Sequence, residues 1–298
     1  MHRLSDCPLG IYEKALPPGD WPALFSRAAE LGFSFVEMSI DESDQRLARL
    51  RWSAAERRRF VAQRQDAAIR VPTICLSANR RFPLGSSNPE TRRTGIELIH
   101  RAVDLADDLG IRVVQLAGYD VYYEPASDQT RQWFLQNLRC VVHYAEARGV
   151  MLSMEIMDTR LMSSVSRFLW YRQQIPSAWF SVYPDLGNLS AWNDNAAQEL
   201  ELGLQMGLVA AVHLKDTLAV SCESEGKFRD VPFGDGCVDF AALFAVLKRH
   251  HYSGAFLLEM WNRGESDTRS VAEAKSWIEE KIWAADQAAD PVNRSAIE

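Results

Sequence analysis

Short apolar segments alternate with longer stretches of helical periodicity along almost the whole chain. In the short segments nearly every position is hydrophobic, as in 113–116 and 180–183, which is typical of strands buried on both faces. In the longer stretches apolar residues recur every three or four positions, which is typical of helices that pack one face on a sheet. This pattern predicts strands at 8–12, 35–38, 71–76, 113–116, 151–155, 180–183, 209–212 and 255–259, and helices at 21–31, 53–67, 89–109, 130–148, 164–174, 195–206, 240–250 and 270–285.

Local signals mark the ends of several predicted helices. Ser53 lies three residues before Glu56, which is the spacing of a capping box at a helix start. Glycine readily adopts the left-handed conformation that closes a helix, so it often follows the last helical residue. The glycines in that position are Gly32, Gly110, Gly149 and Gly207.

The elements follow the order strand then helix, repeated without a long linker or a break in composition. Repeated strand–helix units give parallel strands joined by right-handed crossovers. Eight such units in 298 residues fit a single (β/α)8 TIM barrel better than an open sheet, and neither GxGxxG after the first strand nor GxxxxGK[ST] is present. We therefore expect one α/β domain, a TIM barrel over residues 1–290, with a loosely ordered C-terminal tail at 291–298.

The composition indicates which class of protein carries this fold and where we expect it in the cell. Of the 298 residues 47% are hydrophobic and 24% are charged, which is ordinary for a globular protein. The sequence holds no apolar run of the roughly 18 residues that a membrane span needs, and its N-terminal segment lacks an apolar signal core. Five scattered cysteines without a CxxC pair predict free thiols. We expect a cytoplasmic protein without a membrane partner.

The net charge of the chain limits the kinds of molecule that it is expected to bind. A nucleic-acid surface needs clustered Lys and Arg, so the net charge of -7 argues against nucleic acid as a partner. The same net charge does not argue against a small anionic ligand, because such a ligand needs only a few positively charged side chains close together.

Four predicted strands carry a polar residue at or just after their C-terminal end. In a (β/α)8 barrel these strand ends form the face of the active site, so the four side chains would converge on one rim. Burying four unpaired polar groups is costly, whereas one divalent cation would satisfy them all. Three carboxylates and one imidazole suit Zn²⁺, Mn²⁺, Mg²⁺ or Co²⁺ without selecting among them. The residues are Glu155, Asp185, His213 and Glu259.

Each of these residues, taken alone, has an ordinary structural explanation. Glu155 or Glu259 alone fits a salt bridge at a strand end. Asp185, inside PDLG, fits an Asx turn, and His213 alone fits a hydrogen-bonded core histidine. The ordinary explanation needs four coincidences at equivalent positions, so we favour a metal site.

Longer motifs spread over nearly the whole chain resemble one enzyme family. The segments are PLGIYEKALP, FVEMS, CLS, RRFPLGS, QLAGYDVYY, MEIMD, YPDLGNLSAW, AVHLKDT, VPFGDGCVDF and LLEMW. They are similar to the L-xylulose-5-phosphate (L-ribulose-5-phosphate) 3-epimerases, which belong to the xylose-isomerase-like TIM barrels. One departure is Asn79, at a position where many relatives carry His. If that position touches the substrate, affinity or sugar preference would differ.

The resemblance implies an isomerase that interconverts L-xylulose 5-phosphate and L-ribulose 5-phosphate in pentose or ascorbate breakdown. Such an enzyme removes the proton at C3, next to the C2 ketone, and returns one to the opposite face through a metal-stabilised enediolate. In the family the base and its conjugate acid are glutamates of strands five and eight, which match Glu155 and Glu259. Asp185 and His213 match the remaining ligands of one divalent ion.

A sugar phosphate also needs cations or hydrogen-bond donors close to the metal. Arginines in such loops can instead form salt bridges at the rim of the barrel without binding a phosphate. The candidates in loops of the predicted active face are the cations Lys14, Arg80, Arg81 and Lys215 and the hydrogen-bonding neighbours Ser77, Tyr119 and Asn188.

Other functions share this set of residues. A ketose–aldose isomerase of the hexulose-6-phosphate type also passes through an enediolate, so the ligands alone do not distinguish it from an epimerase. A non-catalytic sugar-phosphate sensor would use the same site without turnover. A multi-metal nuclease usually needs histidines at several strand ends, and only His213 is placed there. The expected partner is a small sugar phosphate, and the loop aromatics are compatible with a homodimer.

Overall fold

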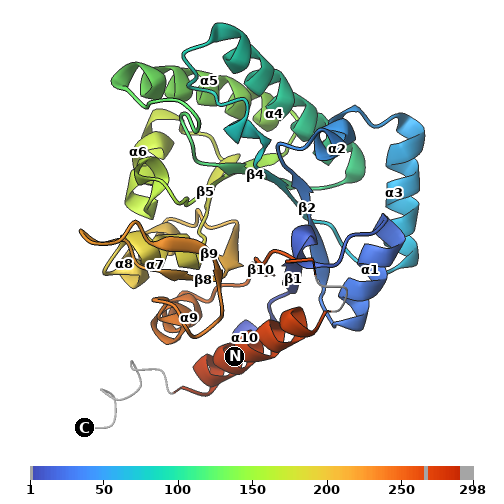
Figure 1. Ribbon diagram of the computed structural model, residues 1–298, viewed down its shortest axis with the longest axis vertical. Coiled ribbons are helices and arrows are strands. Elements are labelled where there is room, and N and C mark those ends of the chain that lie inside the picture. The colour runs from blue at the N-terminus through green and yellow to red at the C-terminus, as the bar shows by residue number, and fades with distance from the viewer. Residues whose placement is uncertain (1–2, 265–267, 289–298) are drawn as a thin grey trace.

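A computed structural model describes residues 3–264 and 268–288 and contains the expected barrel (Figure 1). Eight strands form one parallel sheet in the order β6-β5-β4-β3-β2-β1-β10-β7. Isolated bridges between Val182 and Val209 and between Asp185 and His213 join the two ends of this order and close the ring. The strands are β1 Leu9–Tyr12, β2 Phe35–Ile40, β3 Thr73–Leu76, β4 Val113–Ala117, β5 Met151–Glu155, β6 Phe180–Tyr183, β7 Ala211–Leu214 and β10 Ala255–Leu258.

The long helices lie around the outside of the sheet, each after a barrel strand (Figure 1). They are α1 Trp21–Glu30, α3 Ala54–Asp66, α4 Pro89–Leu109, α5 Asp128–Ala147, α6 Val165–Gln174, α8 Ala196–Gln205, α9 Phe240–Arg249 and α10 Arg269–Gln287. Among the described residues, no helix is both long enough and apolar enough to cross a membrane. The fold class predicted from the periodicity is confirmed.

The connections that follow the strands contain elements that the sequence pattern did not predict. They include an antiparallel hairpin, β8–β9, between β7 and α9. The short elements in these connections are α2 Asp44–Leu47, α7 Leu186–Trp192, β8 Asp216–Leu218, β9 Lys227–Val231 and the 3-10 helices η2 Glu13–Ala15, η3 Ala48–Arg51, η4 Ala78–Arg80 and η5 Arg160–Met162. One more 3-10 helix, η1 Leu4–Asp6, precedes β1.

Most element boundaries agree with the local signals in the sequence. Ser53 and Glu56 form the expected capping box at the start of α3, and the four glycines named above have positive φ. The strand predicted at 209–212 is wrong by two residues, because β7 begins at Ala211. Val209 reaches the sheet only through its isolated bridge to Val182. The predicted tail at 291–298 lies outside the described residues.

The two faces of the strands meet different surroundings. In β2, Val36, Met38 and Ile40 belong to the large apolar core that also takes in the buried faces of the helices. The alternate residues Phe35, Glu37 and Ser39 point into the barrel, since side chains alternate along a strand. Among the described residues the cysteines form no disulfide bond, as expected.

The barrel interior is apolar at one end and polar at the other. Toward the N-terminal ends of the strands, the Phe35 ring covers Gly10, where a Cβ atom would lie 2.2 Å from the ring. Any residue larger than glycine would clash there. Further along the strands the interior carries Glu37 and His213, both fully buried. The polar end therefore coincides with the predicted active face.

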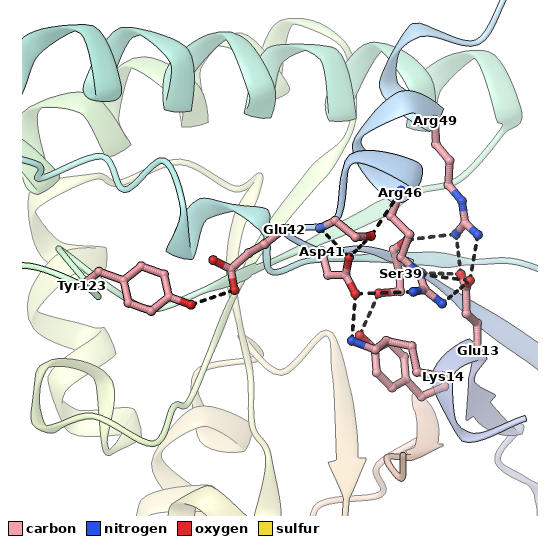
Figure 2. A network of polar contacts seen from close by, with 10 residues as sticks. Glu13, Lys14, Ser39, Asp41, Glu42, Arg46, Arg49 and Tyr123 are labelled. Atoms are coloured by element: carbon pink, nitrogen blue, oxygen red, sulfur yellow. Dashed lines mark hydrogen bonds and ion pairs between the residues drawn. The ribbon is translucent and has the colours of Figure 1, made fainter. Parts of the chain in front are cut away.

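A buried carboxylate ties the loop after β1 to β2 and to the segment that follows it (Figure 2). Glu13 accepts hydrogen bonds from the backbone N–H of Ser39 at 2.7 Å and from both terminal nitrogens of Arg49 at 2.6 and 2.8 Å. Arg46 adds a further bond at 3.1 Å. Glu13 is 3% exposed, and burying a carboxylate is costly unless hydrogen-bonded partners such as these surround it.

We predict that Glu13→Ala lowers the free energy of unfolding by about 3–5 kcal/mol, because it leaves the partly buried guanidinium of Arg49 without its carboxylate partner and leaves Arg46 with only Asp41, at 3.5 Å. Urea denaturation followed by circular dichroism measures the loss. The control is Asp44→Ala, which removes the exposed partner of Arg81 and should change the free energy little. Equal losses in the two variants would show that the Glu13 network does not stabilise the barrel.

Candidate active site

The four predicted ligands meet at the C-terminal end of the barrel. Glu155 is the last residue of β5, His213 lies in β7, and Glu259 directly follows β10. Asp185 follows β6 and caps α7 by accepting the backbone N–H of Asn188 at 2.8 Å. One ligand atom from each of the four residues lies within 4.8 Å of the others, and all four side chains are buried. We call these four residues the quartet.

The geometry of the quartet fits a divalent ion. His213 Nδ1 lies 3.0 Å from Glu155 Oε1, 3.8 Å from Glu259 Oε2 and 3.9 Å from Asp185 Oδ2. An ion bound at about 2.1 Å holds opposite ligands about 4.2 Å apart, so only small side-chain rotations would bring the quartet onto one ion. Three carboxylate oxygens and one nitrogen are also a donor set that such ions accept.

The electrostatics of the quartet indicate a shortage of positive charge. Burial, reinforced by the charges of Glu259 and Glu155, raises the pKa of Asp185 to about 8 even though Lys215 opposes the shift. Burial likewise raises the pKa of Glu155. For Glu259 burial acts in the same direction, but Lys215 and His213 outweigh it and lower the pKa to about 2. A divalent cation would let all three carboxylates ionise.

Lys215 partly fills the role of such a cation. Its Nζ lies 2.8 Å from Asp185 Oδ2 and 2.9 Å from Glu259 Oε2, and its side chain is 9% exposed. This lysine was predicted as a phosphate contact, but its ammonium group is directed at the quartet instead. Burial disfavours the ammonium ion, yet Asp185 and Glu259 hold the pKa of Lys215 above its usual value.

A fifth carboxylate, which the sequence analysis did not single out, orients His213. Glu37 Oε1 lies 3.2 Å from His213 Nε2, so the opposite ring nitrogen, Nδ1, is left facing the other carboxylates. Glu37 Oε2 accepts the hydroxyl of Thr73 at 2.8 Å and lies 3.4 Å from the hydroxyl of Tyr183. Glu37 and His213 have 0% exposure. The available signal was a glutamate inside an otherwise apolar strand.

A narrow cavity of about 30 Å³ opens onto Glu155 and Glu259 of the quartet, and most of the residues predicted to bind the phosphate line it. A larger cavity of about 410 Å³ lies next to it and shares Lys215, Arg229, Glu259 and Trp261 with its wall. The lining residues that the sequence predicted are Lys14, Ser77, Arg80, Glu155, Asn188, Lys215 and Glu259.

Three residues that the sequence suggested as contacts of the substrate do not line this cavity. Arg81 forms an exposed ion pair with Asp44 at 2.9 Å, which is the rim salt bridge considered as its alternative. Tyr119 is buried and accepts a hydrogen bond from Arg80 at 3.3 Å. Asn79 is 1% exposed and donates to the Ala117 carbonyl at 2.7 Å, so it ties η4 to the end of β4.

Comparison with known proteins gives a consistent set of relatives. A family model described as a xylose isomerase-like TIM barrel matches residues 25–281. A putative L-ribulose-5-phosphate 3-epimerase of Escherichia coli K12, SgbU, is 49% identical over 276 residues, which cover 92% of this chain and 96% of that protein. The L-ribulose-5-phosphate 3-epimerase UlaE of Salmonella heidelberg is 48% identical over 277 residues, which cover 92% of this chain and 95% of that protein.

Solved structures share the fold at lower identity. A D-tagatose 3-epimerase-like protein matches with a TM-score of 0.76 and 18% identity, over 94% of this chain and 98% of that one. An L-ribulose 3-epimerase matches with a TM-score of 0.71 and 18% identity, over 97% of each chain. At this level of identity the match is evidence for the fold alone.

We predict that Glu37→Gln weakens divalent-metal binding by about 10–100-fold, because the imidazole loses the charged acceptor that orients it. Titration calorimetry with Zn²⁺ and Mn²⁺ measures the change, and circular dichroism checks that the variant is folded. The matched control is Glu124→Gln, whose carboxylate accepts hydrogen bonds from Ser87 away from the quartet. Wild-type affinity in Glu37→Gln would mean that Glu37 does not orient the metal ligand.

Proposed function

Because this chain belongs to the L-ribulose-5-phosphate 3-epimerase family of the xylose isomerase-like TIM barrels, we propose that it interconverts L-xylulose 5-phosphate and L-ribulose 5-phosphate. Family membership makes the chain an isomerase of the epimerase class. The observation that carries the finer proposal is the convergence of Glu155, Asp185, His213 and Glu259 within 4.8 Å at the polar end of the barrel.

Glu155 and Glu259 are the proposed proton carriers. In the order of the ring, β5 and β10 are separated by β6 and β7, so the two carboxylates approach the site from different sides. One carboxylate takes the C3 proton and the electron pair of the C–H bond passes into the C2 carbonyl, which gives the enediolate. The other carboxylic acid returns a proton to the opposite face of C3. The overall reaction inverts C3 with no net gain or loss of protons.

The quartet is the proposed site of one divalent ion. When bound, the ion would supply Lewis-acid stabilisation of the negative charge that develops on substrate oxygens. Glu155, Asp185, His213 and Glu259 would hold it, and Glu37 would keep the imidazole in position through Nε2. Lys215 would then be released from part of its pairing with Asp185 and Glu259, because the ion takes over the neutralisation of both.

The sugar phosphate is proposed to enter through the narrow cavity. Ser77 and Asn188 line its wall, and each is less than a tenth exposed. Asn188 donates its amide N–H to the Ile156 carbonyl at 2.8 Å, while its buried Oδ1 has no partner among the described residues. That oxygen is free to accept a hydroxyl of the sugar.

We predict that Glu155→Gln and Glu259→Gln each lower the rate of solvent deuterium exchange at C3 by about 10²–10⁴-fold. Each change removes a proton carrier but keeps an oxygen that can bind the ion. Proton NMR of L-xylulose 5-phosphate in D₂O gives the exchange rate, and elemental analysis gives the metal content. The control is Glu42→Gln, which alters the partner of Tyr123 outside the cavity.

Two results would contradict the proposal, one at the level of a single residue and one at the level of the reaction. Near-normal exchange in one of the two variants would show that the altered glutamate is not a proton carrier. An aldose product, with deuterium at C1 or C2 in the wild type, would replace the epimerase by a ketose–aldose isomerase.

Removing the metal should abolish turnover. After dialysis against a chelator the quartet keeps its surplus of carboxylates without a divalent ion, so the enediolate is no longer stabilised. We expect activity to return when Zn²⁺, Mn²⁺, Mg²⁺ or Co²⁺ is added, and the ranking of the four ions identifies the preferred one. Full activity in protein that elemental analysis shows to be metal-free would contradict the proposed role of the quartet.

A further inference from the structure

A buried aspartate lies next to Lys215 in the sequence and belongs to neither the quartet nor the narrow cavity. Asp216 is the first residue of β8, and it is 2% exposed. Its carboxylate accepts four backbone N–H groups, so both of its oxygens are fully used. The donors are Thr217 at 2.9 Å and Val238 at 3.3 Å to Oδ1, and Gly234 at 2.9 Å and Gly236 at 3.1 Å to Oδ2.

The connection from β9 to α9, residues 232–239, closes tightly around this carboxylate. A Cβ atom at Gly236 would overlap the Asp216 side chain, so only glycine fits there. The backbone N–H of Cys237 donates to the Thr217 carbonyl at 2.7 Å and adds a second tie between the same two segments. Asp216 therefore holds the base of the β8–β9 hairpin against the end of β7.

On its other side, the segment 215–217 packs against the start of α7. Thr217 Oγ1 donates to the Gly187 carbonyl at 2.8 Å. A Cβ atom at Gly187 would lie 2.7 Å from Lys215 Cγ and 2.8 Å from Thr217 Cγ2, so the two segments are in close contact. The helix that begins here is the one that Asp185 caps. Segment 215–217 is thus held between a helix anchored by a quartet residue and the base of the hairpin.

The direction of Lys215 depends on this placement of its backbone. Its Nζ bridges Asp185 Oδ2 at 2.8 Å and Glu259 Oε2 at 2.9 Å. A lysine side chain has four flexible carbons and loses much rotamer freedom when it is held in one geometry. A bridge to two carboxylates at once therefore requires that the main chain beneath it is fixed. The hydrogen bonds of the neighbouring Asp216 provide that fixation.

We infer that Asp216 is a positioning residue of the active site, which sets the distance between Asp185 and Glu259 by fixing the segment 215–217. It acts through Lys215, which bridges the two carboxylates, and through the start of α7, which carries Asp185. The inference rests on the proposed function, since it assigns the quartet to a divalent ion. If Asp216 only stabilised the hairpin, its loss would lower the melting temperature and leave the affinity for the ion unchanged.

The test measures divalent-metal affinity in Asp216→Asn, a change that keeps the shape of the side chain but leaves one oxygen for four N–H donors. We expect Zn²⁺ and Mn²⁺ to bind about 10-fold more weakly by titration calorimetry. At saturating metal, kcat for L-xylulose 5-phosphate should fall by about 10-fold, with KM within about threefold of the wild type.

The matched control is Asp239→Ala, which removes the cap of α9 at the end of the same connection. It should lower Tm by about 2–4 °C and leave metal affinity unchanged. Gly236→Ala approaches the same contact from the opposite side and should also weaken metal binding. Because the two changes break one contact, the double variant Asp216→Asn/Gly236→Ala should lose little more affinity than the weaker single variant.

The metal titrations separate this inference from the proposed reaction. If the wild type binds the ions but does not turn over the sugar phosphate, the proposed function fails and the titrations alone decide on Asp216. Wild-type affinity in Asp216→Asn, an equal loss of affinity in Asp239→Ala, or no binding of either ion to the wild type would each overturn the positioning role. Fully additive losses in the double variant would overturn it as well.

Discussion

Surplus negative charge around one buried imidazole is the constraint on which the polar end of this barrel depends. Lys215 pairs with two of the carboxylates around His213, Asp185 and Glu259. The carboxylates that surround the imidazole are Glu37, Glu155, Asp185 and Glu259. Carboxylates in a dry environment favour protonation unless cations compensate them, and the raised pKa of Asp185 expresses this shortage. The same shortage of positive charge would destabilise an ordinary core, whereas here a divalent ion bound by the quartet would relieve it.

The scaffold makes this concentration of charge tolerable. Parallel strands bring consecutive C-terminal ends to one rim, and the apolar shell between sheet and helices remains continuous around them. Inside the barrel, the hydroxyl groups of Thr73 and Tyr183 lie 2.8 and 3.4 Å from the carboxylate of Glu37, so fixed dipoles help to stabilise the group that orients His213. The site is therefore preorganised by strands of the barrel.

Much of this arrangement follows from the sequence, and the parts that do not have physical reasons. The quartet was predictable because equivalent positions on parallel strands must converge. Glu37 was missed because it lies within a strand, where only the fold brings it to His213. The β8–β9 hairpin was missed because β9 is mostly polar and lacks the apolar run of a barrel strand. Arg81 and Arg80 are neighbours in the sequence, yet only the backbone of η4 decides which of them enters the cavity.

The quartet is proposed to move a proton at C3 of a ketopentose 5-phosphate. Incubation of the metal-loaded wild-type protein with L-xylulose 5-phosphate in D₂O, followed by NMR of the isolated sugars, tests it most directly. We expect L-ribulose 5-phosphate to appear with deuterium at C3 and the remaining starting sugar to gain deuterium only at that carbon. Recovery of the starting sugar without deuterium, or a product labelled at another carbon, would contradict the account.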